Sequence, residues 1–167
     1  MNKKDTVVFD LDGTLLDTLE DLKNSVNYAM TQCGYPEHTL DEVRRYVGNG
    51  ILLLMQRAIP GGKDDPNFDK AFTLFKEHYG KHCNDTTKPY AGIMELLHTL
   101  KENNIKIAIV SNKADFAVKE LNAIYFKDLI LVAIGEKESE GIRKKPAPDT
   151  VIEALKQLGS TAENSVY

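Results

Sequence analysis

Two aspartates separated by one residue follow a short apolar segment near the N-terminus. The segment Thr6–Phe9 is followed by Asp10, Leu11, Asp12 and the turn-forming Gly13. Because side chains stop alternating between two faces where a strand becomes a loop, both carboxylates can reach one pocket. In phosphoryl transfer, one ionised carboxylate attacks phosphorus while a neighbour protonates the leaving oxygen. We therefore predict Asp10 as the nucleophile and Asp12 as the acid/base.

The hydrophobic pattern indicates which segments position these residues. Four apolar stripes at helical spacing predict a compact all-helical unit over residues 17–85. Further along the chain, helical patterns alternate with apolar runs at 105–110 and 129–134, which is typical of βαβ units and a parallel sheet. We expect an α/β, Rossmann-like core made of residues 1–16 and 86–167, with the helical domain inserted into it.

The string DLDGTLLDT, which begins at Asp10, resembles the first motif of the haloacid-dehalogenase superfamily, DxDGTLxDT. Later motifs resemble the same superfamily in the expected order, with Ser111, Asn112 and Lys113 as the second and Lys145 before a proline as the third. The resemblance implies that Ser111 and Asn112 bind the transferring phosphoryl group. It also implies that Lys145 balances the charges of the nucleophile and the phosphate.

Each of these groups also has a plainer interpretation. An Asp-Gly pair alone is more often a simple turn, Ser111 also fits a turn or a helix N-cap, and a single lysine is usually solvated. Lys144 is the alternative to Lys145, and we prefer Lys145 because Pro146 restricts the chain beside it. The complete series of motifs favours the functional interpretation.

The resemblance implies a Mg²⁺ cofactor bound by the Asp10 carboxylate and the Asp12 backbone carbonyl, since Mg²⁺ prefers hard oxygen ligands. The superfamily's fourth motif, an acidic pair that completes the metal site, is absent from this sequence, and Val166 and Tyr167 resemble the strand leading into it. We therefore expect the chain to be truncated within the fold and nearly inactive as given. Truncation there would leave the strand at Thr6–Phe9 as an unpaired edge.

The helical insert resembles the superfamily's mobile cap. Within it, Gly48, Asn49 and Gly50 resemble the cap loop of phosphoglycolate phosphatases and are candidate substrate contacts, although a helix-breaking turn explains the glycines equally well. The implied reaction is Mg²⁺-dependent hydrolysis of a small phosphate monoester, such as phosphoglycolate, through an aspartyl-phosphate. The alternatives are a sugar-phosphate mutase of the same superfamily and a catalytically incomplete fragment that acts only as a folded binding module.

The overall composition narrows the range of partners. The 167 residues carry a formal net charge of −4 with scattered Lys and Arg, so we expect no nucleic-acid partner. No apolar run approaches the roughly 20 residues of a membrane span, and Cys33 and Cys83 lack metal-ligand spacing. We expect a cytoplasmic monomer or homodimer that acts on a small phosphorylated metabolite.

Overall fold

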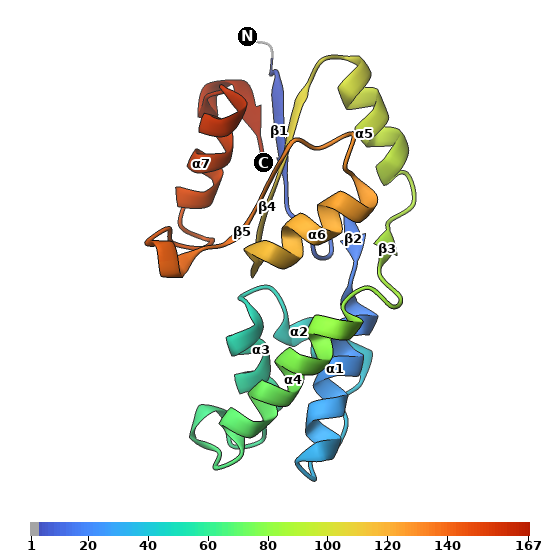
Figure 1. Ribbon diagram of the computed structural model, residues 1–167, viewed down its shortest axis with the longest axis vertical. Helices are drawn as coiled ribbons and strands as arrows, with labels where there is room; N and C mark the ends of the chain where they lie inside the picture. The colour runs from blue at the N-terminus through green and yellow to red at the C-terminus, as the bar shows by residue number, and fades with distance from the viewer. Residues whose placement is uncertain (1–3) are drawn as a thin grey trace. The chain divides into compact units, whose positions relative to one another are not determined.

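The computed structural model describes residues 4–167, which form two compact units (Figure 1). The core comprises the residues up to Leu16 together with Pro89–Tyr167, and the helical unit is Asp17–Lys88. The chain passes between them through two short paired strands, β2 (Leu16–Asp17) and β3 (Lys88–Pro89). The helical unit is therefore an insertion between β1 and the remainder of the core sheet.

The core contains a four-stranded parallel sheet in the order β5-β4-β1-β6. Its strands are β1 (Thr6–Phe9), β4 (Lys106–Ala114), β5 (Val132–Glu136) and β6 (Ser165–Val166). The predicted α/β fold with a parallel sheet is confirmed. The expectation that β1 lies at an edge is wrong, because Thr6 and Val7 pair with Ser165 and Val166 on the side away from β4.

Helices cover both faces of this sheet (Figure 1). They are α5 (Ile93–Glu102), α6 (Asp115–Tyr125) and α7 (Asp149–Leu158), with short 3₁₀ turns at Glu138–Glu140 and Ala162–Asn164. Because strand residues alternate between faces, Ile107 and Ile109 of β4 pack with α5 and α6, whereas Ala108 and Val110 pack with α7. Burial on both faces explains why this part of β4 is continuously apolar.

The strand order reverses beside β1. The chain runs from β1 to β4 and β5 on one side, and then returns through α7 to β6 on the other side of β1. In open α/β sheets, ligands bind outside the carboxyl ends of the strands at such a reversal. This rule points to the residues that directly follow β1.

The helical unit consists of four helices around its own apolar cluster, whose fully buried members include Val26, Met30, Met55 and Phe75. The helices are α1 (Leu19–Gln32), α2 (Leu40–Tyr46), α3 (Ile51–Ala58) and α4 (Phe68–His82), with a 3₁₀ turn at Gly62–Asp64. Thr39 and Glu42 form the expected capping box at the start of α2.

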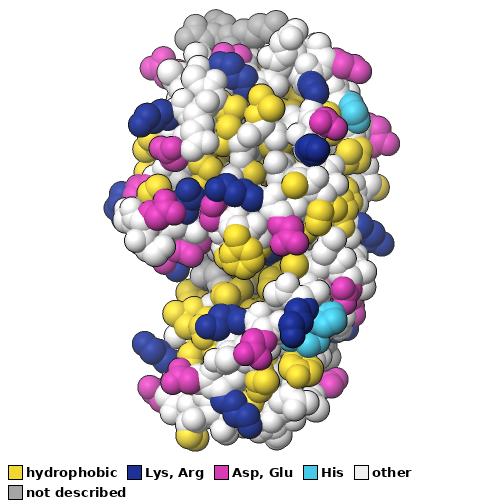
Figure 2. Space-filling view, viewed as in Figure 1, with side chains coloured by type: hydrophobic (Ala, Val, Ile, Leu, Met, Phe, Trp, Pro, Cys, Tyr) yellow, Lys and Arg dark blue, Asp and Glu magenta, His cyan; other side chains and the backbone are white. Residues whose placement is uncertain are grey.

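Charged side chains of both signs are interspersed on the face of the molecule shown in Figure 2, and neither sign dominates it. None of the helices within residues 4–167 combines the length and the apolar character needed to cross a membrane.

Candidate active site at the carboxyl end of β1

Asp10 and Asp12 lie on either side of a residue that anchors the loop after β1. Leu11 between them is fully buried, and its carbonyl accepts hydrogen bonds from the N–H groups of Thr14, Leu15 and Leu16 at 3.2, 3.0 and 3.0 Å. Gly13 has a φ of +77°, a backbone conformation that residues other than glycine rarely adopt. The loop is therefore tightly folded, and it presents both aspartates from a fixed backbone.

Asp10 is held by a lysine and by the backbone. Its Oδ1 lies 2.9 Å from Lys145 Nζ and accepts a 2.7 Å hydrogen bond from the Leu11 N–H. The Asp10 side chain is 36% exposed and that of Lys145 is 17% exposed. Lys145 Nζ also donates to the hydroxyl of Tyr167 at 2.8 Å. The nucleophile predicted from sequence is thus accessible and paired with the predicted lysine.

Asp12 is held by two side chains of β4. Its Oδ1 lies 2.9 Å from Lys113 Nζ, and its Oδ2 accepts a hydrogen bond from the Ser111 hydroxyl at 3.4 Å. The strand register explains this meeting, because Phe9 is opposite Ile109 and the next residues of β4 therefore extend alongside the loop after β1. The structure brings the predicted Asp12 and Ser111 together, and it adds Lys113, which we did not predict as a site residue.

Side chains of Asn112, Arg143 and Lys144 hold the loop that carries Lys145. The Asn112 side chain accepts from the Lys145 N–H at 2.9 Å and donates to the Lys145 carbonyl at 3.2 Å. The Arg143 guanidinium donates two 2.8 Å hydrogen bonds to Asp149, and these hold the pKa of Asp149 below its usual value. Lys144 instead pairs with Glu138 at 2.9 Å. The geometry thus places Lys145, and not Lys144, on Asp10, while phosphate binding by Asn112 stays a prediction.

Gly48, Asn49 and Gly50 lie in the helical unit, between α2 and α3. Gly48 and Gly50 have φ values of +108° and +87°, and Gly50 is the N-cap of α3. Arg57 donates to Asn49 Oδ1 at 3.0 Å and to the Tyr46 carbonyl at 2.7 Å. These contacts and φ values explain the loop as a helix-breaking turn, and substrate contact by this loop stays a prediction.

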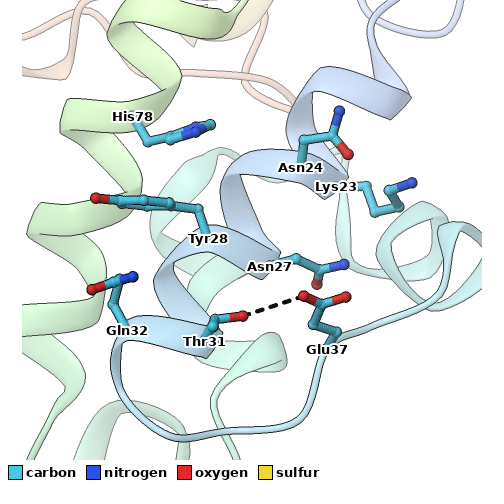
Figure 3. A pocket seen from close by; sticks show the side chains of 8 residues that line it. All are labelled: Lys23, Asn24, Asn27, Tyr28, Thr31, Gln32, Glu37 and His78. Carbon is cyan, nitrogen blue, oxygen red and sulfur yellow. Dashed lines mark hydrogen bonds between the residues drawn. The ribbon is translucent and has the colours of Figure 1, made fainter.

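The helical unit also carries a surface pocket between α1, α4 and the segment after α1 (Figure 3). The Tyr28 ring stacks on His78 at a centroid distance of 4.4 Å, and Thr31 donates a 3.3 Å hydrogen bond to Glu37, which also lines the pocket. Burial and the neighbouring His82 lower the pKa of His78. The pocket contains no pair of carboxylates and none of the residues predicted from sequence to carry chemistry.

The residues at the end of β1 offer some of the donor atoms that a magnesium site needs. The Asp10 carboxylate and the Asp12 backbone carbonyl are hard oxygen donors, and Mg²⁺ is commonly bound by one or two carboxylates with substrate phosphate and water completing its shell. Within residues 4–167, no group of three or more His, Cys, Asp and Glu side chains is arranged to hold a metal. These two donors therefore fit part of a Mg²⁺ shell.

Comparison with known proteins gives one consistent family. The model of the haloacid dehalogenase-like hydrolases matches residues 7–167. A phosphoglycolate phosphatase of Thiobacillus denitrificans is 33% identical over 159 residues, which are 92% of this chain and 69% of that protein. One of Aquifex aeolicus is 32% identical over 164 residues, which are 96% of this chain and 73% of that protein. For a relative from Pseudomonas putida the chain spans only 60% of the length.

A crystal structure agrees with these sequence relatives. A protein of Lactobacillus delbrueckii subsp. bulgaricus, described as a candidate phosphoglycolate phosphatase, superposes with a TM-score of 0.88 at 33% identity. The match covers 99% of this chain and 77% of that one. The match spans the β1 loop, β4 and the Lys145 loop, which together carry the site described above. The chain belongs to the haloacid dehalogenase-like hydrolases.

Proposed function

We propose that the protein is a Mg²⁺-dependent phosphatase that hydrolyses a small phosphate monoester through an aspartyl-phosphate on Asp10. The observation that carries this proposal is the pairing of each carboxylate with its own lysine in one site, Asp10 with Lys145 and Asp12 with Lys113. Relatives named phosphoglycolate phosphatase support the reaction class.

In the first step Asp10 attacks phosphorus. Both described contacts of its carboxylate use Oδ1, so we assign the attack to Oδ2. A new O–P bond forms, the P–O bond to the leaving group breaks, and Asp12 donates its proton to the departing oxygen. When bound, Mg²⁺ would neutralise part of the charge that otherwise keeps a phosphate dianion away from Asp10.

In the second step water releases the phosphate. The Asp12 carboxylate, now deprotonated, accepts a proton from water as the water oxygen attacks phosphorus. The bond between Asp10 and phosphorus breaks, which frees inorganic phosphate and returns both aspartates to their starting states. Lys145 keeps a positive charge beside Asp10 throughout, and the Ser111 hydroxyl offers a hydrogen-bond donor next to the reacting group.

Phosphoglycolate is the first substrate to test, because relatives that are 32% and 33% identical to this chain are named phosphoglycolate phosphatase. A small phosphorylated metabolite as the partner, a cytoplasmic location and a monomeric or dimeric state stay predictions. None of them follows from the geometry of the site.

The test is an assay of the protein encoded by the complete reading frame, with and without Mg²⁺, on phosphoglycolate and on other small phosphate monoesters. We expect release of inorganic phosphate that requires Mg²⁺, and D10N serves as the inactive control. A phosphorylated isomer as the product would favour the mutase alternative. Substrate binding without phosphate release would favour the binding module.

A further inference from the structure

Lys113 is an unusually buried lysine at the end of β4. Its side chain is 5% exposed, whereas that of Asp12, its partner, is 28% exposed. Removing an ammonium group from water is unfavourable unless an opposite charge and hydrogen bonds replace the lost hydration. The 2.9 Å contact between Lys113 Nζ and Asp12 Oδ1 supplies that charge. The ammonium group is thus placed in the interior next to the carboxylate that we assign as acid/base.

Lys113 and Ser111 hold Asp12 as a unit. Ser111 donates its hydroxyl to Asp12 Oδ2 at 3.4 Å and accepts the Lys113 backbone N–H at 3.2 Å. The two residues are two positions apart on β4, where side chains share a face of a strand. Each oxygen of the Asp12 carboxylate therefore has a partner on β4. Residues of β4, and not of the loop that carries Asp12, orient this carboxylate.

This arrangement differs from that of Asp10. The lysine of Asp10 comes from the loop before α7, and its exposed fraction is 17%, compared with 5% for Lys113. A lysine that bound the substrate phosphate would need to reach the opening of the site. Lys113 instead extends from β4 and its ammonium group contacts Asp12. This position suits a residue that holds Asp12 in place and does not bind the substrate.

We propose that Lys113 is a positioning residue that, together with Ser111, fixes the Asp12 carboxyl group where it meets the leaving oxygen. The proposal rests on the proposed function. Loss of this support should matter most when the leaving group needs a proton. An alkyl phosphate such as phosphoglycolate leaves as a basic alkoxide, whereas 4-nitrophenyl phosphate releases a stable phenolate that needs little help.

The experiment compares K113M with the unsubstituted complete protein on both esters. We expect kcat/KM for phosphoglycolate to fall about 100-fold, the scale of a misplaced catalytic group, and kcat/KM for 4-nitrophenyl phosphate to fall by about threefold or less. In the D12N background, K113M should change kcat/KM by less than about twofold, because the group that it positions is already lost. K106M is the matched control, since Lys106 lies on the same strand and its side-chain amine donates to the Gly159 carbonyl at 3.0 Å, away from the candidate site.

Equal losses on both esters would overturn the proposal and would indicate that Lys113 binds phosphate or only supports the fold. If K113M does not fold, K113R is measured in the same way, since it keeps the positive charge but changes its position.

A crystal structure of the variant gives a readout that needs no activity. We expect the Asp12 side chain to leave its contact with Ser111, and an unchanged Asp12 would contradict the proposal. A complete protein that hydrolyses neither ester would instead contradict the proposed function, and the Asp12 orientation would still test Lys113.

Discussion

At the scale of single residues, the candidate site consists of two carboxyl groups, each of which is paired with its own lysine. Lys145 faces Asp10 and Lys113 faces Asp12, each at 2.9 Å. Two unscreened carboxylates in one small site would repel one another and an incoming phosphate. Separate lysines allow each carboxylate to keep its own task, attack for one and proton transfer for the other.

The role of Lys145 can be tested against its immediate neighbour. We expect K145M to lower kcat/KM by about 10²- to 10³-fold, the usual effect of removing one group that stabilises developing charge. K144M should stay within about twofold of the unsubstituted protein, because Lys144 pairs with Glu138 and not with Asp10. Steady-state kinetics on phosphoglycolate measures both variants. Similar losses of kcat/KM in K145M and K144M would mean that the total positive charge of this loop matters, and not the contact between Lys145 and Asp10.

The acid/base role of Asp12 leads to a second prediction. We expect D12N to slow turnover of phosphoglycolate by about 10²- to 10⁴-fold, the range for a lost acid/base group. The Mg²⁺ concentration for half-maximal activity should change little, because the backbone carbonyl that we propose as a ligand survives the substitution. Near-normal turnover of this alkyl phosphate would assign the proton transfer to another residue.

Sequence reasoning predicted most of this site but not all of it. Asp10, Asp12, Ser111 and Lys145 were predicted from their motifs, and the structure pairs Asp10 with Lys145 and Asp12 with Ser111. Lys113 was named as part of the second motif but was not predicted as a site residue, because most lysines are solvated. Its position two residues after Ser111 on a strand was the available signal, since such residues share a face.

At the scale of secondary structure elements, the close contact between α6 and β5 depends on Gly135, which has no side chain. A Cβ at Gly135 would lie 2.4 Å from the Asp115 Cα and 2.6 Å from the Lys113 carbonyl oxygen. The Gly135 N–H also donates to Asp115 Oδ1 at 2.9 Å. Only glycine lets the start of α6 approach β5 so closely, next to the strand that carries Lys113.

We therefore expect G135A to lower the free energy of unfolding by about 1 to 3 kcal/mol, the usual range for overpacking. G80A is the matched control, because Gly80 lies within α4 and its added Cβ would meet nothing within 4 Å. There alanine should raise the free energy of unfolding by about 0.5 to 1 kcal/mol. Urea denaturation followed by circular dichroism measures both. A harmless G135A would mean that the backbone shifts easily at this contact.

Asp21 joins α1 to the end of the helical unit. It is 1% exposed, and its carboxylate accepts hydrogen bonds from the N–H and hydroxyl groups of both Thr86 and Thr87 at 2.7 to 3.1 Å. Burial alone would raise the pKa of Asp21, but these hydrogen bonds outweigh burial and lower it. A carboxyl group with a lowered pKa in the folded state stabilises the fold above the pKa of the unfolded chain, and this contribution is lost as the pH falls.

We expect D21N to lower the free energy of unfolding by about 2 to 3 kcal/mol at neutral pH, because an amide leaves some of these buried donors without an acceptor. The difference from the unsubstituted protein should shrink as the pH falls below about 4, where Asp21 itself becomes protonated on unfolding. D69N is the control, since Asp69 is an exposed acid in the first turn of α4. A D21N penalty that is independent of pH would show that the charge of Asp21 contributes nothing.

The boundaries of two strands differ from those predicted, for physical reasons. The apolar run over 129–134 was read as a strand, but β5 begins only at Val132. Leu129 and Ile130 are buried in the core as part of the preceding loop, and Leu131 is 85% exposed, so the run reflects packing and not strand pairing. β4 extends to Ala114 although its apolar run ends at Val110, because Ser111 and Lys113 are buried by polar partners that hydrophobicity does not reveal.

At the scale of the whole molecule, the chain combines a core that contains the candidate chemistry with an inserted helical unit that has a separate apolar cluster. The alternation of helices and apolar runs was sufficient to predict the parallel core sheet, and helical periodicity was sufficient to predict the insert. Val166 and Tyr167 were read as the start of a strand, but β1 was expected to be left unpaired, and the pairing of β1 with β6 was therefore not predicted. Membership of the haloacid dehalogenase-like hydrolases rests on a match over residues 7–167.

The most direct test of the central claim is chemical trapping of the phosphorylated enzyme. The complete protein is mixed with Mg²⁺ and phosphoglycolate and quenched during turnover, and the acyl phosphate is reduced with borohydride, which converts an aspartyl-phosphate to homoserine. Peptide mass spectrometry should then find homoserine at position 10, and D10N treated in the same way should give none. Turnover without any modified peptide, or homoserine at another aspartate, would contradict the assignment of Asp10 as the nucleophile.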